Sequence, residues 1–351
     1  MRIGVMLPNW IGDVVMATPT LRALYNWFGP DVQITGVMRP YVSQVLEGTP
    51  WINKKLTYDR RSKNSNHRWV GVSKALRQLD VEWIFVLPNS LRAGAIAWLS
   101  GARQRTGYVR NGRGLLLNRS LRPLRNAGRW KPVSAVDYYL KLAYLAGCPP
   151  SPQHLELDTT TEEERQADRV WDRLGLWSAS QVVALNTGGA YGASKNWPVE
   201  YFIELAQRIS DETNANVLVL CGPQERRTAD EIEVRARRPQ VKSLAKDDLS
   251  VGLLKACIRR STLLVTTDSG PRHFAAAFNI PSVALFGAQD PRWSMNYHPQ
   301  EILLQHQVPC GPCGQRTCPL VHHQCMHQLS VDRVFQAVQQ QTKLNRLAPA
   351  A

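Results

Sequence analysis

The sequence has no uninterrupted apolar segment of about 20 residues, the length a helix needs to cross a bilayer. Its first residues do not form a secretory signal either, because their apolar stretch is short, contains Asp13 and leads to no small-residue cleavage site. Internal repeats and low-complexity segments are also lacking. We therefore expect a soluble, cytoplasmic protein, and 351 residues suit two domains of ordinary size.

Acidic residues are scarce in the first half of the chain. Residues 1–150 hold 22 Lys and Arg against 7 Asp and Glu, whereas residues 151–351 hold 21 of each, so the whole net charge of +15 lies in the first half. From Gly101 to Lys131 there is no acid at all. This asymmetry indicates an anionic partner, such as nucleic acid, anionic lipid or a phosphorylated or carboxylated glycan. The alternative is a basic face that only contacts solvent.

Strand-like and helix-like segments alternate along both halves. We expect strands at 2–7, 32–37, 82–87 and 104–108 and again at 182–186, 216–221, 262–266 and 282–286, with helices between them. This order predicts an α/β protein with a mainly parallel sheet in each half. The proline-rich stretch 146–152 is the expected linker between domains at 1–150 and 151–330, followed by a terminal helix at 331–345 and a frayed tail at 346–351.

The first strand is followed by a tight turn and a helix start that contains Asp13. Ligands of open α/β sheets bind at such strand ends, where helix N-termini offer free N–H groups. A carboxylate in this position stays ionised because the helix dipole lowers its pKa. Asp13 is therefore either a general base or an ordinary helix cap.

Comparable turns follow three strands in the second half. Asp268, Ser269 and Gly270 have the composition of a phosphate cradle, and His273 lies one helical turn further on. Lys195, on a loop rich in small residues, is typical of a phosphate clamp. Glu225 follows the strand at 216–221 and is either a ribose ligand or an ordinary acid in the first turn of a helix.

Four cysteines, Cys310, Cys313, Cys318 and Cys325, form a C-x2-C-x4-C-x6-C pattern within the loop at 308–327. In a cytosolic protein this spacing favours a metal over disulfides, and four ligands from one loop would make a small structural zinc site. The alternative is a compact loop of reduced, metal-free thiols.

These residues resemble the ADP-heptose:lipopolysaccharide heptosyltransferases of glycosyltransferase family 9, and the type II members most closely. The resemblance extends from Met1 to about residue 342. Its marks in the first half are Trp10-Ile11-Gly12-Asp13, Leu87-Pro88-Asn89-Ser90 and Arg105-Thr106-Gly107-Tyr108. In the second half they are Gly-Ala-x-Gly-x-x-Lys-x-Trp-Pro at 189–198 and Thr267-Asp268-Ser269-Gly270-x-x-His273.

The resemblance implies a GT-B fold, in which two Rossmann-like domains with mainly parallel sheets face each other across a cleft. It implies inverting, metal-independent transfer from ADP-L-glycero-β-D-manno-heptose to the heptosylated inner core of lipopolysaccharide, a Kdo- and heptose-bearing lipid A. Asp13 matches the family's proposed base, and Lys195 would act in catalysis and on the donor. Further donor ligands would be Thr187, Gly188, Glu225, Asp268, Ser269, Gly270 and His273.

The basic first domain would then contact the acceptor, with Arg60, Arg61, Lys63, Asn89, Ser90 and Arg113 as the expected ligands. Because that acceptor lies in an anionic membrane, we expect a monomer that is peripheral to the inner face of the inner membrane. No nucleic-acid partner is expected, since no recognisable nucleic-acid module is present. The alternatives are a related transferase with another sugar or acceptor, an anion- or nucleic-acid-binding protein, and a catalytically inactive glycan-binding protein.

Overall fold

The structure is a computed structural model that describes residues 1–189 and 191–347, and it divides the chain into two compact units. The first unit comprises Met1–Asp158 with Arg292–Asn296, and the second comprises Thr159–Pro291 with Tyr297–Ala351. The division therefore falls after Asp158, beyond the proline-rich linker where we expected it. The return of 292–296 to the first unit was not predicted from the sequence.

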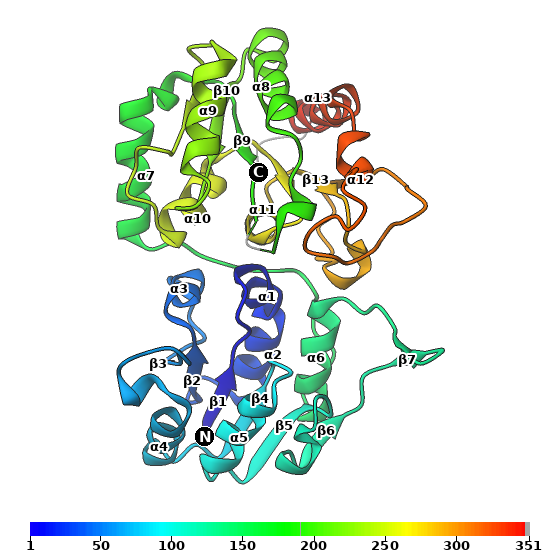
Figure 1. Cartoon of the computed structure of the whole chain (residues 1–351). Coiled ribbons are helices and arrows are strands. Elements are labelled where there is room, and N and C mark those ends of the chain that lie inside the picture. Colours follow the sequence, from blue (N-terminus) through cyan, green and yellow to red (C-terminus); the bar gives the residue numbers. More distant parts are fainter. Residues whose placement is uncertain (190, 348–351) are drawn as a thin grey trace. The chain divides into compact units, whose positions relative to one another are not determined.

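The first unit contains a six-stranded parallel sheet in the order β3-β2-β1-β4-β5-β6, with helices on its faces (Figure 1). Its strands are β1 (Arg2–Met6), β2 (Gln33–Met38), β3 (Lys54–Thr57), β4 (Trp83–Val86), β5 (Gln104–Tyr108) and β6 (Arg119–Leu121). Its helices are α1 (Ile11–Met16), α2 (Thr18–Phe28), α3 (Pro40–Ser43), α4 (Trp69–Gln78), α5 (Leu91–Leu99) and α6 (Ala135–Leu145), with short 3-10 turns at η1 (Gln44–Leu46), η2 (Ser65–His67) and η3 (Arg113–Leu116). A small antiparallel hairpin, β7 (Arg125–Asn126) with β8 (Arg129–Trp130), lies outside the sheet.

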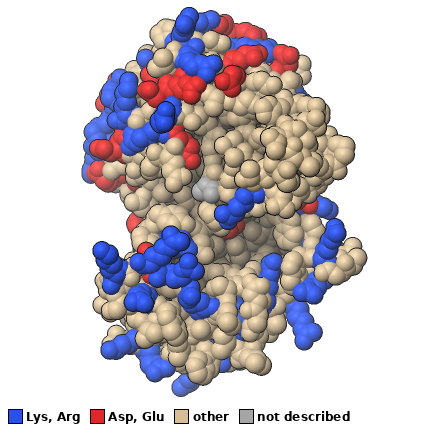
Figure 2. Space-filling view, viewed as in Figure 1, with Lys and Arg blue, Asp and Glu red and all other residues tan. Residues whose placement is uncertain are grey.

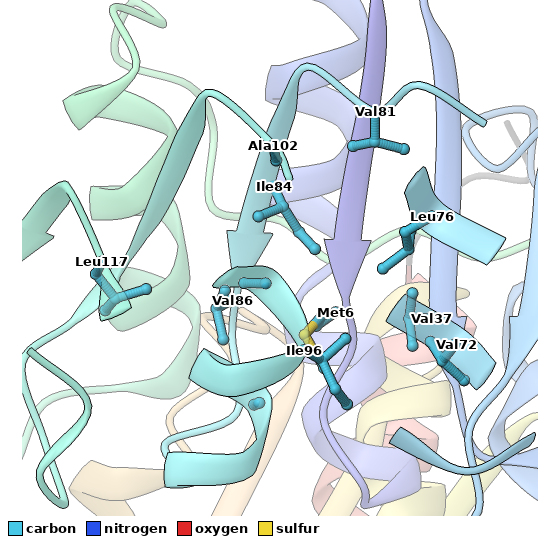
Figure 3. Close-up of a cluster of buried hydrophobic side chains, with 12 residues drawn as sticks. Met6, Val37, Val72, Leu76, Val81, Ile84, Val86, Ile96, Ala102 and Leu117 are labelled. Carbon is cyan, nitrogen blue, oxygen red and sulfur yellow. The ribbon is translucent and has the colours of Figure 1, made fainter. Parts of the chain in front are cut away.

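The core of this unit forms where the central strands carry continuous apolar runs, as parallel strands buried on both faces do. Met6 of β1 and Ile84 and Val86 of β4 pack with Leu76 of α4 and Ile96 of α5, all 2% exposed or less (Figure 3). This packing fixes the positions of β1 and β4, and therefore of the loops that follow their carboxyl ends.

The helical segment expected between the first two strands is two helices. α1 ends at Met16, Ala17 joins the two, and α2 begins at Thr18 with Pro19 in its first turn. Proline lacks the N–H that would continue the hydrogen bonding of α1, but it is tolerated in the first turn of a helix, so a new helix starts there.

The second unit repeats the strand arrangement, with the parallel order β11-β10-β9-β12-β13-β14. Its strands are β9 (Val182–Asn186), β10 (Asn216–Leu220), β11 (Val241–Ser243), β12 (Leu263–Thr267), β13 (Ser282–Phe286) and β14 (Glu301–Gln305). Its helices are α7 (Thr161–Leu174), α8 (Val199–Thr213), α9 (Arg226–Ala236), α10 (Val251–Arg260), α11 (Gly270–Ala277), α12 (Gln324–His327) and α13 (Val331–Leu347), with 3-10 turns at η4 (Leu176–Ser178) and η5 (Ala193–Lys195). A further 3-10 turn, η6 (Pro291–Trp293), begins in this unit and ends in the segment that belongs to the first.

Both sheets have the Rossmann strand order 3-2-1-4-5-6, in which the direction of winding reverses beside the first strand. The expected α/β fold with two mainly parallel sheets is confirmed. Of the tail expected at 346–351, the first two residues belong to α13 and the rest lie outside the described residues. No helix within residues 1–189 and 191–347 is both long enough and apolar enough to cross a membrane.

Candidate active site

Three neighbouring strands of the second unit bring the predicted donor ligands to one edge of the sheet. β9 lies between β10 and β12, and all three run parallel, so their carboxyl ends meet at the same edge. The loops that leave this edge are 187–198, 221–225 and 268–269. Such an edge, beside the strand where winding reverses, is where open α/β sheets bind ligands.

Lys195 and Asp268 form the central contact of this site. The Lys195 Nζ donates to Asp268 Oδ2 at 2.6 Å and to the Asp268 carbonyl at 2.9 Å. The ammonium also lies 4.7 Å from the centroid of the Tyr191 ring. Because an ammonium has three donors and two are directed at Asp268, the contact holds the lysine in place and leaves donor capacity for an anion.

Asp268 is buried and yet ionised. Burial by itself would raise the pKa of Asp268, but the positive charges of Lys195 and Arg272 outweigh it and hold the pKa below the ordinary value. Arg272 is fixed in turn by Glu301, to which its Nε and Nη2 donate at 2.8 and 2.6 Å. A chain of alternating charges thus anchors the start of α11 to strand β14.

The turn before α11 is held by a residue that the sequence analysis did not single out. Asn186, at the end of β9, donates from Nδ2 to Ser269 Oγ at 2.9 Å, to Thr266 Oγ1 at 3.1 Å and to the Gly188 carbonyl at 3.0 Å. The amide therefore joins the loops after β9 and β12. Its place at the end of a predicted strand was the only signal for it in the sequence.

Glycine is needed where the β9 loop meets Glu225. A Cβ on Gly188 would lie 2.6 Å from Glu225 Cγ, too close for any larger residue without displacement. Glu225 Oε2 accepts a hydrogen bond from the Gly222 N–H at 3.1 Å, and Glu225 precedes α9 as its N-cap residue. Thr187 is buried, at 5% exposure, so its side chain is part of the interior beneath this loop.

His273 lies within the first turns of α11 and is neutral. Burial, and after it the nearby Arg272 charge, lower its pKa to about 3. Its Nδ1 has no hydrogen-bond partner among the residues that the structure describes. His273 therefore cannot supply a positive charge to a bound anion at neutral pH. The groups of this site with the chemistry to hold an anion are Lys195 and the N-terminus of α11, which begins at Gly270.

In the first unit, Asp13 lies in the first turn of α1, directly beyond the carboxyl end of β1. Asp13 is half-buried. The pKa of the neighbouring Tyr139 is raised mainly by burial of that tyrosine and further by the negative charge of Asp13. The N-cap residue of α1 is Trp10, so Asp13 is not the cap that the alternative interpretation required. An ionised carboxylate at a strand end can serve as a general base.

The loop after β4 is supported from below by Arg113. This side chain is fully buried, donates from Nε to the Tyr108 carbonyl at 2.8 Å and from Nη2 to Asn89 Oδ1 at 2.9 Å, and contacts the Pro88 carbonyl through Nη1. Burial lowers the pKa of Arg113 to about 10, which leaves it charged at neutral pH. Arg113 was expected to contact the acceptor, but in this structure it positions the 87–90 loop instead.

The other residues of this loop are also engaged. Asn89 Oδ1 accepts a second hydrogen bond from the Tyr138 hydroxyl at 3.0 Å, and Ser90 Oγ caps α5 by accepting from the Ala93 N–H at 3.1 Å. Within the described residues, the Asn89 side chain forms hydrogen bonds through Oδ1 only, so its amide nitrogen remains available to a ligand.

Arg60, Arg61 and Lys63 lie on the loop after β3 and are exposed. None of the three side chains forms an ion pair within the described part of the chain. Figure 2 shows that Lys and Arg over the first unit have few acidic neighbours, whereas the second unit carries both signs. These residues therefore present uncompensated positive charge, which attracts anions over a range limited by salt.

The four cysteines of the loop 308–327 converge without forming a metal site. Cys310, Cys313, Cys318 and Cys325 all line one cavity of about 30 Å³, and the Cys310 Sγ lies 4.0 Å from His322 Nε2. Burial raises the pKa of Cys325, and the three other thiols raise it further. Within residues 1–189 and 191–347, however, no group of three or more His, Cys, Asp or Glu is placed to hold a metal ion. The zinc hypothesis is therefore not supported, because sequence spacing brought the thiols together but not to ligand geometry.

Comparison with known proteins agrees with this arrangement. Residues 69–324 match the model of glycosyltransferase family 9 (heptosyltransferase). The chain is 25% identical to lipooligosaccharide heptosyltransferase 2 of Campylobacter jejuni, over 99% of this chain and 100% of that protein. It is 27% identical to lipopolysaccharide heptosyltransferase 2 of Escherichia coli K12, over 96% of this chain and 97% of that protein.

Among solved structures, the fold is similar to that of E. coli ADP-heptose lipopolysaccharide heptosyltransferase II, with a TM-score of 0.80 and 23% identity over 99% of this chain and 100% of that one. The match to this family model, over most of the chain, makes the protein a glycosyltransferase. The chain belongs to glycosyltransferase family 9, the heptosyltransferases.

Proposed function

We propose that this glycosyltransferase moves L-glycero-D-manno-heptose from ADP-heptose to the heptosylated inner core of lipopolysaccharide, as a type II heptosyltransferase. The observation that carries the proposal is the Lys195–Asp268 contact at the start of α11, where a held ammonium and a helix N-terminus share one strand edge. The names of the relatives, several of which are heptosyltransferase 2, support the choice of donor and acceptor.

The proposed chemistry is a single displacement with inversion. A hydroxyl of the acceptor's heptose attacks the anomeric carbon of the donor, and Asp13 removes the proton from that hydroxyl. The new glycosidic bond forms as the bond between the anomeric carbon and the diphosphate oxygen breaks, and ADP leaves with that electron pair. Lys195 and the N–H groups at Ser269 and Gly270 stabilise the developing negative charge. No step needs a metal ion.

The roles of the remaining donor residues follow from their contacts. Asp268 and Asn186 hold the lysine and the α11 turn in place, while Gly188 and Glu225 shape the neighbouring loop for the nucleoside. His273 contributes a neutral imidazole beneath the turn. Because the lysine is already held before a ligand binds, little ordering of its side chain opposes donor binding.

We place the acceptor on the first unit, at the exposed cations Arg60, Arg61 and Lys63 and at Asn89. An acceptor dense in carboxylates and phosphates complements the charge of this unit. The same charge would draw the protein to an anionic membrane surface, so we propose peripheral binding at the inner face of the inner membrane, by a monomer.

The test is to incubate the purified protein with ADP-heptose and heptosylated Kdo2-lipid A and to measure the mass of the product. A mass increase of one heptose, with release of ADP, is expected. Heptose-free Kdo2-lipid A and ADP-glucose serve as matched controls for acceptor and donor. Transfer to the heptose-free acceptor, or transfer of glucose at an equal rate, would instead indicate a related transferase with another specificity.

A further inference from the structure

The first unit contains a cavity that none of the expected donor or acceptor ligands lines. It measures about 230 Å³, and its wall includes four cations and two tryptophans: Arg110, Arg122, Lys131, Lys141, Trp130 and Trp293. Arg110 follows β5, Arg122 follows β6, Lys141 lies on α6, and Trp130 belongs to the β7–β8 hairpin. The cavity is therefore built from four separate segments of the first unit and one more that returns from far along the chain.

That returning segment is the stretch 292–296. It belongs to the first unit although it follows most of the second in sequence, and the Ser134 hydroxyl donates to the Met295 carbonyl at 2.6 Å. This attachment brings Trp293 to the wall of the cavity, where it is 42% exposed. Within the described residues its ring has no aromatic or cation partner, so its face is available to a ligand.

The charges on the wall are uncompensated. In the part of the chain that the structure describes, Arg110, Arg122, Lys131 and Lys141 form no ion pair. The nearby carboxylate of Asp137, whose charge contributes to raising the pKa of Tyr108, accepts a hydrogen bond from Gln153. Four like charges around one small space repel one another, so an anion bound among them would relieve that repulsion.

Arg110 is prepared to bind such an anion. Its guanidinium lies 4.6 Å from the centroid of the Trp130 ring, and Arg125 lies over the same ring at 4.0 Å. Stacking on an aromatic face fixes the plane of a guanidinium and leaves its N–H edges free to donate. The Arg110 Nε is buried and has no hydrogen-bond partner among the described residues. A buried N–H without a partner costs free energy, and an acceptor atom of a bound ligand would remove that cost.

We propose that this cavity is a subsite for one anionic sugar ring of the acceptor, a ring that carries a carboxylate or a phosphate group. The four cations take the anionic group, and the open face of Trp293 takes the C–H face of the ring. The volume suits one ring, because cavities for drug-sized molecules begin at about 300 Å³. That the bound ring belongs to the acceptor rests on the function proposed above. The recognition of an anionic sugar by this cavity does not.

The experiment titrates the full-length protein, without donor, with glucuronate, glucose 6-phosphate, glucose and inorganic phosphate, and follows the fluorescence of its tryptophans and the saturation-transfer signals of the sugars. The test variant is Arg122→Ala/Lys131→Ala. The matched control, Lys74→Ala/Arg129→Ala, removes the same charge from exposed positions that do not line the cavity. A third variant, Trp293→Ala, removes the proposed ring contact without changing the charge.

Both anionic sugars are expected to bind saturably, and the test variant should weaken them by about tenfold or more, since charge-assisted hydrogen bonds are among the strong ones. The control should retain the wild-type affinity, and glucose should not bind. Trp293→Ala should weaken glucose 6-phosphate but not inorganic phosphate, which has no ring to stack.

Three results would overturn the proposal. Equal weakening in test and control variants would mean that only the general field of the unit attracts anions. Equal affinity for inorganic phosphate and glucose 6-phosphate, unaffected by Trp293→Ala, would mean an anion site without sugar recognition. Binding of phosphatidylglycerol vesicles but of no sugar, lost in the test variant alone, would mean a lipid headgroup site. The titration contains no donor and measures binding alone. Its outcome therefore does not depend on whether the protein transfers heptose.

Discussion

The Nζ of Lys195 lies 2.6 Å from Oδ2 of Asp268, although the two residues are 73 positions apart in the chain. Their side chains are 13% and 9% exposed, so the pair is largely shielded from water. The contact joins the loop after β9 to the turn after β12 and helps to keep Asp268 ionised. It prepares a positive charge beside the N-terminus of α11 before any ligand arrives, which is the arrangement a departing diphosphate needs.

Replacing Lys195 with Ala should weaken ADP binding and slow transfer, because the diphosphate loses a preorganised charge and Asp268 is left buried without its nearest partner. We expect a loss of about tenfold or more in affinity, as for one charge-assisted contact. Calorimetric titration of ADP measures it, with the exposed Lys246→Ala as a control of equal charge. Unchanged affinity and turnover would remove Lys195 from the donor site.

Asp13→Asn should leave the fold and ADP affinity intact and lower turnover by about 10²–10⁴-fold, the usual contribution of a positioned base. The amide keeps the size of the side chain but cannot accept a proton from the attacking hydroxyl. Turnover at saturating substrates is the measurement, and Asp31→Asn, at an exposed position of the same unit, is the control. A variant that turns over at the wild-type rate would exclude Asp13 as the base.

Arg60→Ser/Arg61→Ser should raise the apparent KM for the acceptor and leave that for ADP-heptose unchanged. Added salt should act in the same direction, because attraction between exposed charges is screened over about 8 Å at physiological ionic strength. Initial rates over a range of each substrate separate the two effects. The comparison variant is Lys74→Ser/Arg103→Ser, which removes two exposed charges elsewhere on the unit. Equal changes for both substrates would favour a basic face that contacts only solvent.

The stability of the protein should depend on pH through His273. Its folded pKa of about 3 lies below the ordinary value of 6.5, so between these values the unfolded state binds the proton and the folded state does not. The contribution to stability is therefore full above about pH 6.5 and is lost as the pH falls toward 3. His273→Gln should show a shallower loss of unfolding free energy from pH 7 to pH 4 in urea titrations. Parallel curves for the two proteins would show that His273 does not titrate in this way.

Chelation should leave the melting temperature unchanged, because the four cysteines of the 308–327 loop are not at ligand distances. A thiol reagent should modify the exposed Cys310 and Cys313 first and reach the buried Cys257 only after unfolding, since burial also raises the pKa of Cys257. Reaction rates and elemental analysis measure both expectations. About one equivalent of metal per chain, together with a lower melting temperature after chelation, would restore the zinc hypothesis.

The central strands and the turns after them could be predicted from the sequence, because strands buried on both faces carry continuous apolar runs and end in small or polar residues. β1, β4, β9 and β12 are of this kind, and they place Asp13, Asn89, Lys195 and Asp268 at strand ends. The edge strands β3, β6, β11 and β14 were missed. Each is short or partly exposed and pairs on one side only, so its sequence has no such run.

Only the tertiary structure decided what each candidate side chain contacts. Sequence placed Arg113 among the surface cations, but the fold buries it beneath Asn89, because buried carbonyls there need a donor. Sequence placed four cysteines in one loop, and the path of the backbone kept them from ligand geometry. The approach of Trp293 to Lys131 and Arg110 joins positions far apart in the chain. Residue type and local pattern determine elements and their ends, whereas distances between side chains of different elements depend on how the whole chain packs.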